Sequence, residues 1–276
     1  MDMKFLLILT LITAASAQKC RGTFFNNKYY NMEVLKEGLN RVKQMIYSSK
    51  ENSVYFIYDQ GGILYNGGAG YYNLNNHQAG FFMGIRNATS LAVDNNKNRI
   101  YIGCAEGLYA VTDGNLPERF PISEPILSLY YKDDLYFTNI RRKVYKFDLD
   151  GVKLVPEMRY DFADNIIVDD DNNLFFLKDK KVNRVKLDTG APAFEVTEFP
   201  VNLMTMDVDG KLYVATNDGI YLYNRYKYAL DKISNLKNVK ALSFDKKWDP
   251  IYVVFDLLVR LKNPVECYED NDAFFK

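Results

Sequence analysis

Short apolar runs alternate with polar turns along the whole of this chain. The pattern is clearest in residues 90–94, 99–102 and 107–111, which two short polar turns separate. The runs are rich in Val, Ile, Leu, Tyr and Phe, and the segments between them hold Asp, Asn, Gly and Lys, which is typical of strands and tight turns. The pattern therefore predicts an all-β protein.

This unit of three runs recurs six times, and one aromatic residue marks the second run of each copy. The six markers are Tyr55, Tyr101, Tyr136, Phe175, Tyr213 and Tyr252. Their spacing of about 35 to 46 residues is typical of one propeller blade per repeat. Because one copy cannot cover its own apolar faces, the copies must pack side by side and close into a ring. We therefore predict a six-bladed β-propeller; a β-sandwich is the alternative, but it does not require the repeat.

Individual segments extend this prediction. The second run of each copy is apolar on both faces, which suits a strand packed between two blades, and Asp94 and Asp207 begin turns. The aromatic hairpin at residues 23–30 is expected to contribute part of the outer edge of the sixth blade, so that N- and C-terminal strands close the ring. Residues 61–80 are interpreted as a Gly- and Asn-rich insertion in the first blade, with residues 67–70 in a turn.

Length and charge indicate one domain without a strong electric field. At 276 residues and 48% hydrophobic, the chain can bury about three quarters of its unfolded surface. We predict a single domain at residues 18–276 and a monomer. Lys plus Arg equals Asp plus Glu at 35 each, so nothing favours nucleic acid or an anionic membrane as a partner.

The first residues predict export. Lys4, an apolar stretch at residues 5–14 and small residues at 15–17 form the three parts of a secretory signal peptide, 1–17. A membrane anchor would need about 20 apolar residues.

The cysteines also suggest specific roles. In a secreted propeller, whose termini meet, a Cys20–Cys267 disulfide would close the ring and stabilise the fold by up to about 5 kcal/mol in the chain-entropy model. Cys104 is expected to be a buried free thiol, and Asn87 begins a glycosylation sequon.

Catalytic motifs are weak throughout. His77 is the only histidine, which argues against a histidine dyad or a multi-imidazole zinc site, and no Gly-x-Ser-x-Gly elbow occurs. The acidic run 169–171 lacks the EF-hand spacing and is expected to be a solvated turn. We therefore predict no catalytic residue, no protein-bound metal and no cofactor. The alternative, a propeller hydrolase with axial calcium, could use Asn139, Asn165 and Asp207 as ligands.

The architecture itself supplies a candidate binding site at the mouth of the axial channel. Loops before each inner strand and between second and third strands rim one end of the ring. The residues predicted there are Gln44, Met45, Thr89, Ser90, Ser128, Asn139, Arg141, Asn165, Met204 and Lys240. Polar and methionine side chains of this kind could enclose a flat ligand, and Arg141 or Lys240 could form an ion pair with a ligand carboxylate. Each of these side chains could equally serve only to pack the channel.

The chain resembles the insect ommochrome-binding proteins. The resemblance rests on the signal peptide, Cys20, residues 32–38, the phrase Asp-Val-Asp-Gly-Lys-Leu-Tyr at 207–213 leading to 218–221, and residues 259–262 before Cys267. It implies a secreted haemolymph carrier of ommochromes, which are flat aromatic pigments derived from tryptophan. The rival interpretations are a calcium-dependent lactonase or esterase on the same scaffold, and an extracellular protein-interaction module with exposed aromatics on one flat face.

Overall fold

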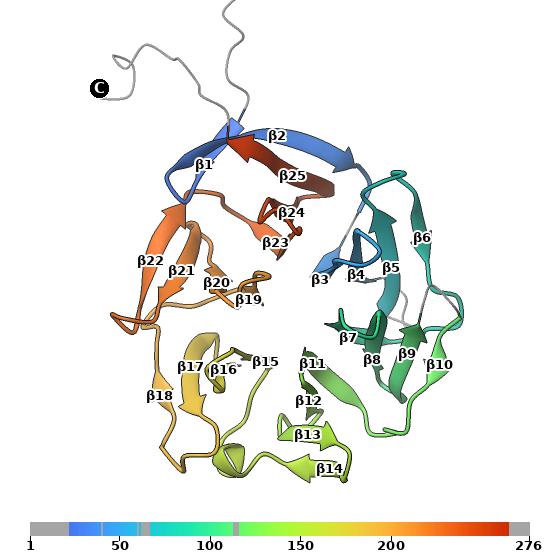
Figure 1. Ribbon diagram of the computed structural model, residues 1–276, viewed down its shortest axis with the longest axis vertical. Helices are drawn as coiled ribbons and strands as arrows, with labels where there is room; N and C mark the ends of the chain where they lie inside the picture. Colours follow the sequence, from blue (N-terminus) through green and yellow to red (C-terminus); the bar gives the residue numbers. More distant parts are fainter. Residues whose placement is uncertain (1–21, 40, 60, 62–66, 113–115, 265–276) are drawn as a thin grey trace, which may run out of the picture.

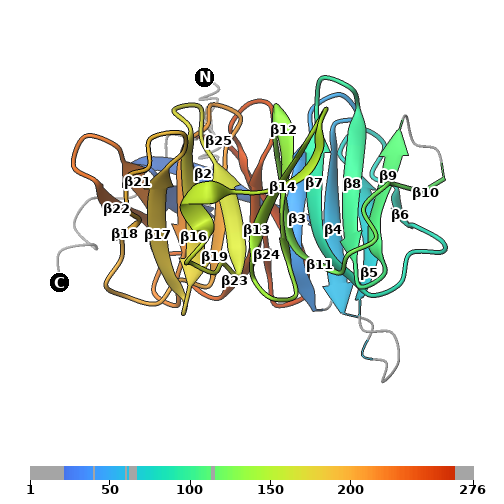
Figure 2. The same ribbon diagram turned by 90° about the horizontal axis from the view of Figure 1, so that it is seen from below.

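A computed structural model describes residues 22–39, 41–59, 61, 67–112 and 116–264 (Figure 1). Six antiparallel sheets surround one axis, so the predicted all-β, six-bladed propeller is confirmed. Seen from the side, the blades stand next to one another in a disc (Figure 2). The predicted signal peptide and both Cys20 and Cys267 lie outside the described residues.

The first three blades each hold four strands, named in chain order from the axis outwards. Blade 1 comprises β3 (Val42–Ser48), β4 (Ser53–Asp59), β5 (Gly67–Asn73) and β6 (Ala79–Phe81). Blade 2 comprises β7 (Ala88–Asp94), β8 (Arg99–Cys104), β9 (Gly107–Thr112) and β10 (Glu118–Arg119). Blade 3 comprises β11 (Ile126–Lys132), β12 (Asp134–Asn139), β13 (Val144–Asp148) and β14 (Gly151–Leu154).

The other three blades complete the ring. A short 3-10 helix, η1 (Pro156–Met158), precedes blade 4. Blade 4 comprises β15 (Asn165–Val168), β16 (Asn173–Lys178), β17 (Lys181–Lys186) and β18 (Phe194–Glu195). Blade 5 comprises β19 (Leu203–Met206), β20 (Leu212–Ala215), β21 (Ile220–Asn224) and β22 (Ala229–Ser234). Blade 6 comprises β23 (Val239–Phe244), β24 (Pro250–Val254), β25 (Leu257–Pro264), β2 (Lys28–Lys36) and β1 (Gly22–Phe25).

The N-terminal hairpin closes the ring. Strand β2 pairs antiparallel with β25, and β1 then pairs with β2. The hairpin was expected to supply part of one edge; instead both of its strands join blade 6, which therefore has five strands. Closure also involves side chains, because the Tyr72 hydroxyl of blade 1 donates to the Leu35 carbonyl of β2 over 2.9 Å.

The hydrophobic core is divided among the contacts between blades. Six clusters of buried side chains each join two neighbouring blades. The marker aromatics of the repeat all lie in second strands and are all buried. This confirms the prediction that these strands are apolar on both faces because both faces pack against another blade. Cys104, at the end of β8, is a buried free thiol as predicted.

Aspartates at the ends of inner strands form the turns that the sequence predicts. Asp94 Oδ1 accepts hydrogen bonds from the backbone N–H groups of Asn96 and Lys97, each over 3.0 Å. Asp207 Oδ1 accepts from the N–H groups of Asp209 and Lys211, each over 2.9 Å. The backbone N–H groups of these turns have no partner in a neighbouring strand, and in both turns the aspartate carboxylate accepts their hydrogen bonds instead.

One prediction about blade 1 is wrong. Residues 61–80 are not an insertion, because they contain β5, and residues 67–70 form a strand rather than a turn. The glycines are needed for close approach: a Cβ on Gly67 would lie 2.1 Å from the Ala88 carbonyl oxygen, and one on Gly68 would lie 2.5 Å from the Tyr58 ring. A strand with so few side chains carries almost none of the usual strand signal.

Candidate functional site

The six inner strands β3, β7, β11, β15, β19 and β23 surround the propeller axis (Figure 1). Two cavities lie along this axis, a narrow one of about 190 Å³ where the inner strands begin and a wide one of about 430 Å³ where they end. Gln44, Met45, Asn165 and Met204 line both cavities. The two cavities therefore adjoin at these four residues, and together they are called the axial channel below.

The narrow cavity is at the mouth that the sequence predicts. Most of the predicted binding residues line it, namely Gln44, Met45, Thr89, Ser90, Ser128, Asn165 and Met204. All seven lie in inner strands, and Asn165 is the first residue of β15. Every inner strand begins at the same end of the ring. Residues at equivalent positions in the repeat, which the sequence identifies, therefore come together at that end.

Several of these polar side chains link one blade to the next. Gln44 Nε2 in blade 1 donates to the Leu91 carbonyl of β7 over 3.1 Å, and Leu91 N–H donates to Gln44 Oε1 over 2.7 Å. Strand β7 pairs only with β8, so this amide acts as the missing neighbour of its inner edge. Thr89 Oγ1 contacts the Ile126 carbonyl oxygen of blade 3 over 2.7 Å in the same way. These contacts link blade 1 to blade 2 and blade 2 to blade 3 at the wall of the channel.

Three of the predicted residues do not line either cavity. Asn139 ends β12, where its Oδ1 accepts from the N–H groups of Arg141 and Lys143 and stabilises the turn to β13. Arg141 and Lys240 are exposed. The two cations expected to meet a ligand carboxylate are therefore outside the cavity linings, Arg141 in the turn after β12 and Lys240 near the start of β23.

The wide cavity was missed by the sequence analysis. It is lined by the ends of inner strands and the turns that follow, and among its residues are Tyr47, Asp94, Asn95, Tyr130, Tyr131, Lys132, Asp133, Asp170, Thr205, Met206, Asp207, Ser243 and Phe244. Its volume is within the range of about 300 to 1,000 Å³ typical of small-molecule sites. The repeated Asp after each inner strand could have indicated this end, but the aspartates were assigned only to turns.

Tyrosine and methionine side chains form the apolar part of the wide cavity. The Tyr130 hydroxyl of blade 3 donates to Met206 Sδ of blade 5 over 3.2 Å, so it reaches past the intervening inner strand. Burial raises the pKa of Tyr130, and the carboxylates of Asp170 and Asp169 add to the effect. The phenol therefore remains neutral at physiological pH and offers a ligand an aromatic, uncharged surface.

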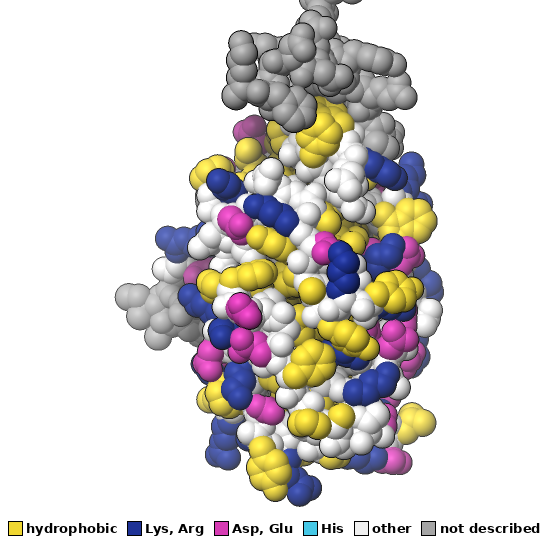
Figure 3. Space-filling model, turned by 90° about the vertical axis from the view of Figure 1, so that its left-hand side faces the viewer, with side chains coloured by type: hydrophobic (Ala, Val, Ile, Leu, Met, Phe, Trp, Pro, Cys, Tyr) yellow, Lys and Arg dark blue, Asp and Glu magenta, His cyan; other side chains and the backbone are white. Residues whose placement is uncertain are grey.

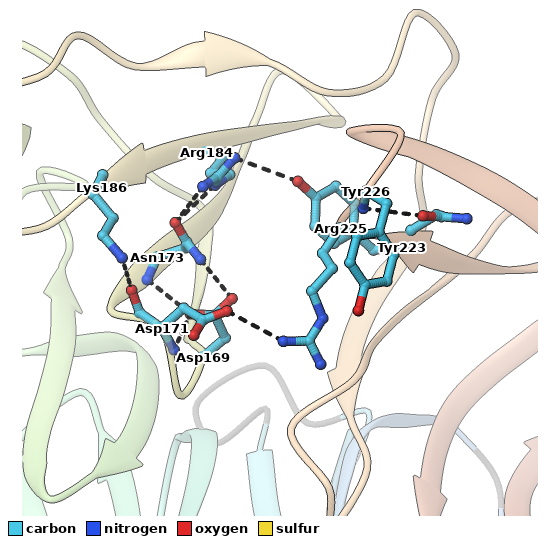
Figure 4. A network of polar contacts seen from close by, with 9 residues as sticks. Asp169, Asp171, Asn173, Arg184, Lys186, Tyr223, Arg225 and Tyr226 are labelled. Atoms are coloured by element: carbon cyan, nitrogen blue, oxygen red, sulfur yellow. Dashed lines mark hydrogen bonds and ion pairs between the residues drawn. The ribbon is translucent and has the colours of Figure 1, made fainter.

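Blades 4 and 5 are also joined away from the axis, by the polar network drawn in Figure 4. Arg184 Nε and Nη2 both donate to Asn173 Oδ1, over 2.8 and 2.6 Å. Arg184 Nη1 contacts the Tyr223 hydroxyl over 3.5 Å, and Arg225 pairs with Asp171. The acidic run 169–171 thus begins the turn between β15 and β16, as predicted. Asp171 pairs with Arg225 of blade 5, and Asp170 pairs with Lys132 of blade 3.

The outer rim of the same blades carries exposed aromatic side chains. Phe194, Tyr226 and Tyr228 are exposed, and the Arg184 guanidinium lies 5.3 Å from the Phe194 ring and 5.1 Å from the Tyr228 ring. Figure 3 views the ring from this side and shows hydrophobic groups interspersed with Lys, Arg, Asp and Glu. On this side of the ring the exposed aromatic side chains are therefore not gathered into one flat face.

The residues considered for catalysis or metal binding do not converge. His77 is exposed in the turn between β5 and β6, where its Nδ1 lies 2.9 Å from the Tyr72 hydroxyl. Asn165 begins β15 and Asp207 follows β19, at opposite ends of the channel. Within the described residues, no group of three His, Cys, Asp or Glu side chains could hold a metal ion.

Comparison with models of known protein families gives no match. The chain is, however, similar to the ommochrome-binding protein of Manduca sexta, with 24% identity over 254 residues that cover 88% of this chain and 91% of that protein. The resemblance to ommochrome-binding proteins is confirmed. It extends over nearly the whole propeller and therefore is not limited to the repeated turn phrase that many propellers share.

Solved structures share the fold at low sequence identity. A gluconolactonase from Xanthomonas campestris matches with a TM-score of 0.66 and 11% identity, over 87% of this chain and 91% of that one. A streptogramin B lyase matches at 0.60 and 13%, over 84% and 97%. The WD40 propeller domain of Doa1 matches at 0.59 and 14%, over 89% and 98%. Because these proteins differ in function, the likeness establishes the propeller architecture alone.

No helix in the part of the chain that the structure describes has the length and apolar character needed to cross a membrane.

Proposed function

We propose that this protein is a non-catalytic, secreted carrier that binds an ommochrome or a related flat aromatic metabolite of tryptophan in its axial channel. The similarity to an ommochrome-binding protein along nearly the whole chain carries this proposal. The wide cavity supports it independently, because its volume of about 430 Å³ suits a small organic molecule.

The lining supplies the interactions that such a guest requires. Met45, Met204 and Met206 offer polarizable thioethers, which make favourable contacts with aromatic rings. Tyr130 and Tyr131 offer ring surfaces for stacking or edge contacts. Gln44 and Asn165, which line both cavities, lie where they can bond polar atoms of a guest that extends through the channel. In this proposal the predicted narrow-mouth residues contact one end of the guest.

A titration of purified protein with a xanthommatin-type phenoxazone, followed by its visible absorption, tests the proposal. We expect saturable binding of one pigment per chain. The variant Thr205→Trp adds a large side chain to the cavity wall and should weaken binding at least about tenfold, whereas Thr189→Trp, on an exposed hairpin, should leave binding unchanged. Absence of saturable binding by the unmodified protein would contradict the carrier function.

The fold likeness to a gluconolactonase keeps a lactonase or esterase as the second candidate. That enzyme would need several oxygen ligands around an axial calcium ion. In this chain Asp207 Oδ1 already accepts two backbone N–H groups, and its Oδ2 accepts from the Tyr213 hydroxyl over 3.0 Å. Carriage is therefore the better-supported function. Lactone hydrolysis that disappears on chelation would reverse this order.

A further inference from the structure

Corresponding residues of four inner strands line the wide cavity at one level. In blades 2, 4, 5 and 6 an aspartate at the end of the inner strand begins a turn by accepting a backbone N–H group; these are Asp94, Asp169, Asp207 and Asp245. The residue two positions earlier lines the wide cavity in all four blades, as Ala92, Ile167, Thr205 and Ser243. The first two are apolar, and the two hydroxyls belong to neighbouring blades 5 and 6 (Figure 1).

Both of these hydroxyls are available to a molecule in the cavity. Ser243 is 5% exposed, and Thr205 is partly buried. Within the described residues neither side chain has a hydrogen-bond partner. Buried polar groups in native proteins usually have one, and a hydroxyl on a cavity wall obtains it from solvent or from a guest that replaces the solvent.

Asn165 adds a third free donor on the same side of the channel. Ser128 Oγ donates to Asn165 Oδ1 over 3.3 Å, and Asn165 Nδ2 has no partner in the part of the chain that the structure describes. By contrast, Gln44 and Thr89 of blades 1 and 2 bond backbone groups of the next blade. Free hydrogen-bonding groups are therefore concentrated on the wall that blades 4, 5 and 6 form.

We propose that Asn165, Thr205 and Ser243 form a subsite for the polar edge of the guest, and that through it the channel selects flat rings that carry a carbonyl oxygen. This deepens the carrier function and rests on it. All three side chains can donate, and a carbonyl oxygen accepts up to two hydrogen bonds. Met204 and Met206, on either side of Thr205 in β19, also line the wide cavity and can contact the rings.

The test compares two probes, unsubstituted phenoxazone, which has a ring carbonyl, and phenoxazine, which has the same three fused rings and no carbonyl. Isothermal titration calorimetry of the full chain measures both affinities. Hydrophobic burial alone would favour phenoxazine, because it is the more apolar probe. We expect phenoxazone to bind at least about tenfold more tightly. Equal affinities, or tighter binding of phenoxazine, would overturn the carbonyl selection and leave the carrier function intact.

Two variants remove the hydroxyls and nearly keep the shape of the cavity. Ser243→Ala and Thr205→Val should each reduce the preference for phenoxazone several-fold. Thermal stability should not fall, because neither hydroxyl bonds another described residue. Ser48→Ala and Thr138→Val are the matched controls: their hydroxyls are also buried without a partner among the described residues, but they line neither cavity of the channel. The controls should leave the preference unchanged.

A third variant reverses the hydrogen-bonding character of the amide. Asn165→Asp keeps an oxygen for the Ser128 hydroxyl but replaces the free N–H groups by a carboxylate acceptor, so the preference for phenoxazone should fall. A preference that is unchanged in all three channel variants would overturn the proposal. Failure of both probes to bind would instead contradict the carrier function on which it rests.

Discussion

Arg260 of β25 donates two hydrogen bonds to one carboxylate oxygen of Glu33 in β2, from Nε over 2.9 Å and from Nη2 over 2.7 Å. The two residues are separated by nearly the whole chain, yet they face each other across the strand pair that closes the ring. Arg260 is mostly buried, with 14% of its side chain exposed. This contact therefore joins the beginning of the propeller to its end.

The Glu33→Gln variant should weaken this closure. Loss of the carboxylate charge turns an ion pair into a hydrogen bond between the charged guanidinium and a neutral amide oxygen, so the free energy of unfolding should fall by about 1 kcal/mol. Urea denaturation measures the change. The matched control is Asp150→Asn, which removes the exposed ion pair with Lys153 and should cost almost nothing. Equal effects in the two variants would show that the Glu33 contact does not stabilise the ring.

Replacement of Gln44 by Leu should expose the inner edge of β7. The variant keeps the approximate size of the side chain but removes both hydrogen bonds to Leu91, and it should destabilise the fold by about 1 to 2 kcal/mol. Hydrogen exchange provides a local measurement: the Leu91 amide should exchange faster than in the unmodified protein, while amides of β20 should not. Unchanged exchange at Leu91 would contradict the role assigned to the Gln44 amide.

The contact between Gly67 and blade 2 leaves no room for a side chain. Gly67→Ala would place a methyl group against the Ala88 backbone, so blades 1 and 2 would have to separate locally, at a cost of about 1 to 3 kcal/mol. In the control, Gly190→Ala, the new methyl group meets nothing, and only the positive φ of 66° opposes it. A smaller loss of thermal stability for Gly67→Ala than for Gly190→Ala would refute this account of the Gly-rich strand.

Stability should decline at alkaline pH. Burial raises the pKa of Tyr252 to about 12, from an ordinary value of 10.0. Between these two values the folded state binds more protons than the unfolded state, so the contribution is complete below pH 10 and is lost as pH rises towards 12. The two-unit shift corresponds to at most about 3 kcal/mol.

The Tyr252→Phe variant isolates this contribution. Urea unfolding at a series of pH values above 9 should show a shallower loss of stability in the variant than in the unmodified protein. Tyr252 also contacts Met32 Sδ over 3.5 Å, so a constant offset between the two curves is expected as well. Parallel curves at every pH would mean that Tyr252 does not contribute to the alkaline loss.

The periodic parts of the fold could be predicted from sequence, and the reasons are local. Tyr101 and Tyr213 each lie in a run that is apolar on both faces, and only a strand packed between two blades satisfies such a run. Asp94 and Asp207 begin turns because their carboxylates bond nearby backbone N–H groups. The Gly-rich strand β5 was not predicted because it has almost no side chains to give a strand pattern. It needs glycine because blade 2 packs closely against it, and the sequence does not show that contact.

The binding site was only partly predictable. Repeat spacing placed Gln44 and Met204 at the start of inner strands, and they do line the channel. It could not show that the larger cavity lies at the other end, because the volume of that cavity depends on how side chains such as Tyr130 and Met206 are arranged around it. Nor could it show that Arg141 points to solvent.

Methyl-¹³C NMR of methionine-labelled protein tests the central claim most directly, because methionines occur both inside and outside the channel. Met45, Met204 and Met206 line the wide cavity, Met158 is buried beside blades 3 and 4, and Met83 is exposed. On addition of a xanthommatin-type pigment, aromatic ring currents should shift the three channel signals and leave those of Met158 and Met83 in place. Shifts confined to methionines outside the channel, or no shift at saturating pigment, would contradict the account.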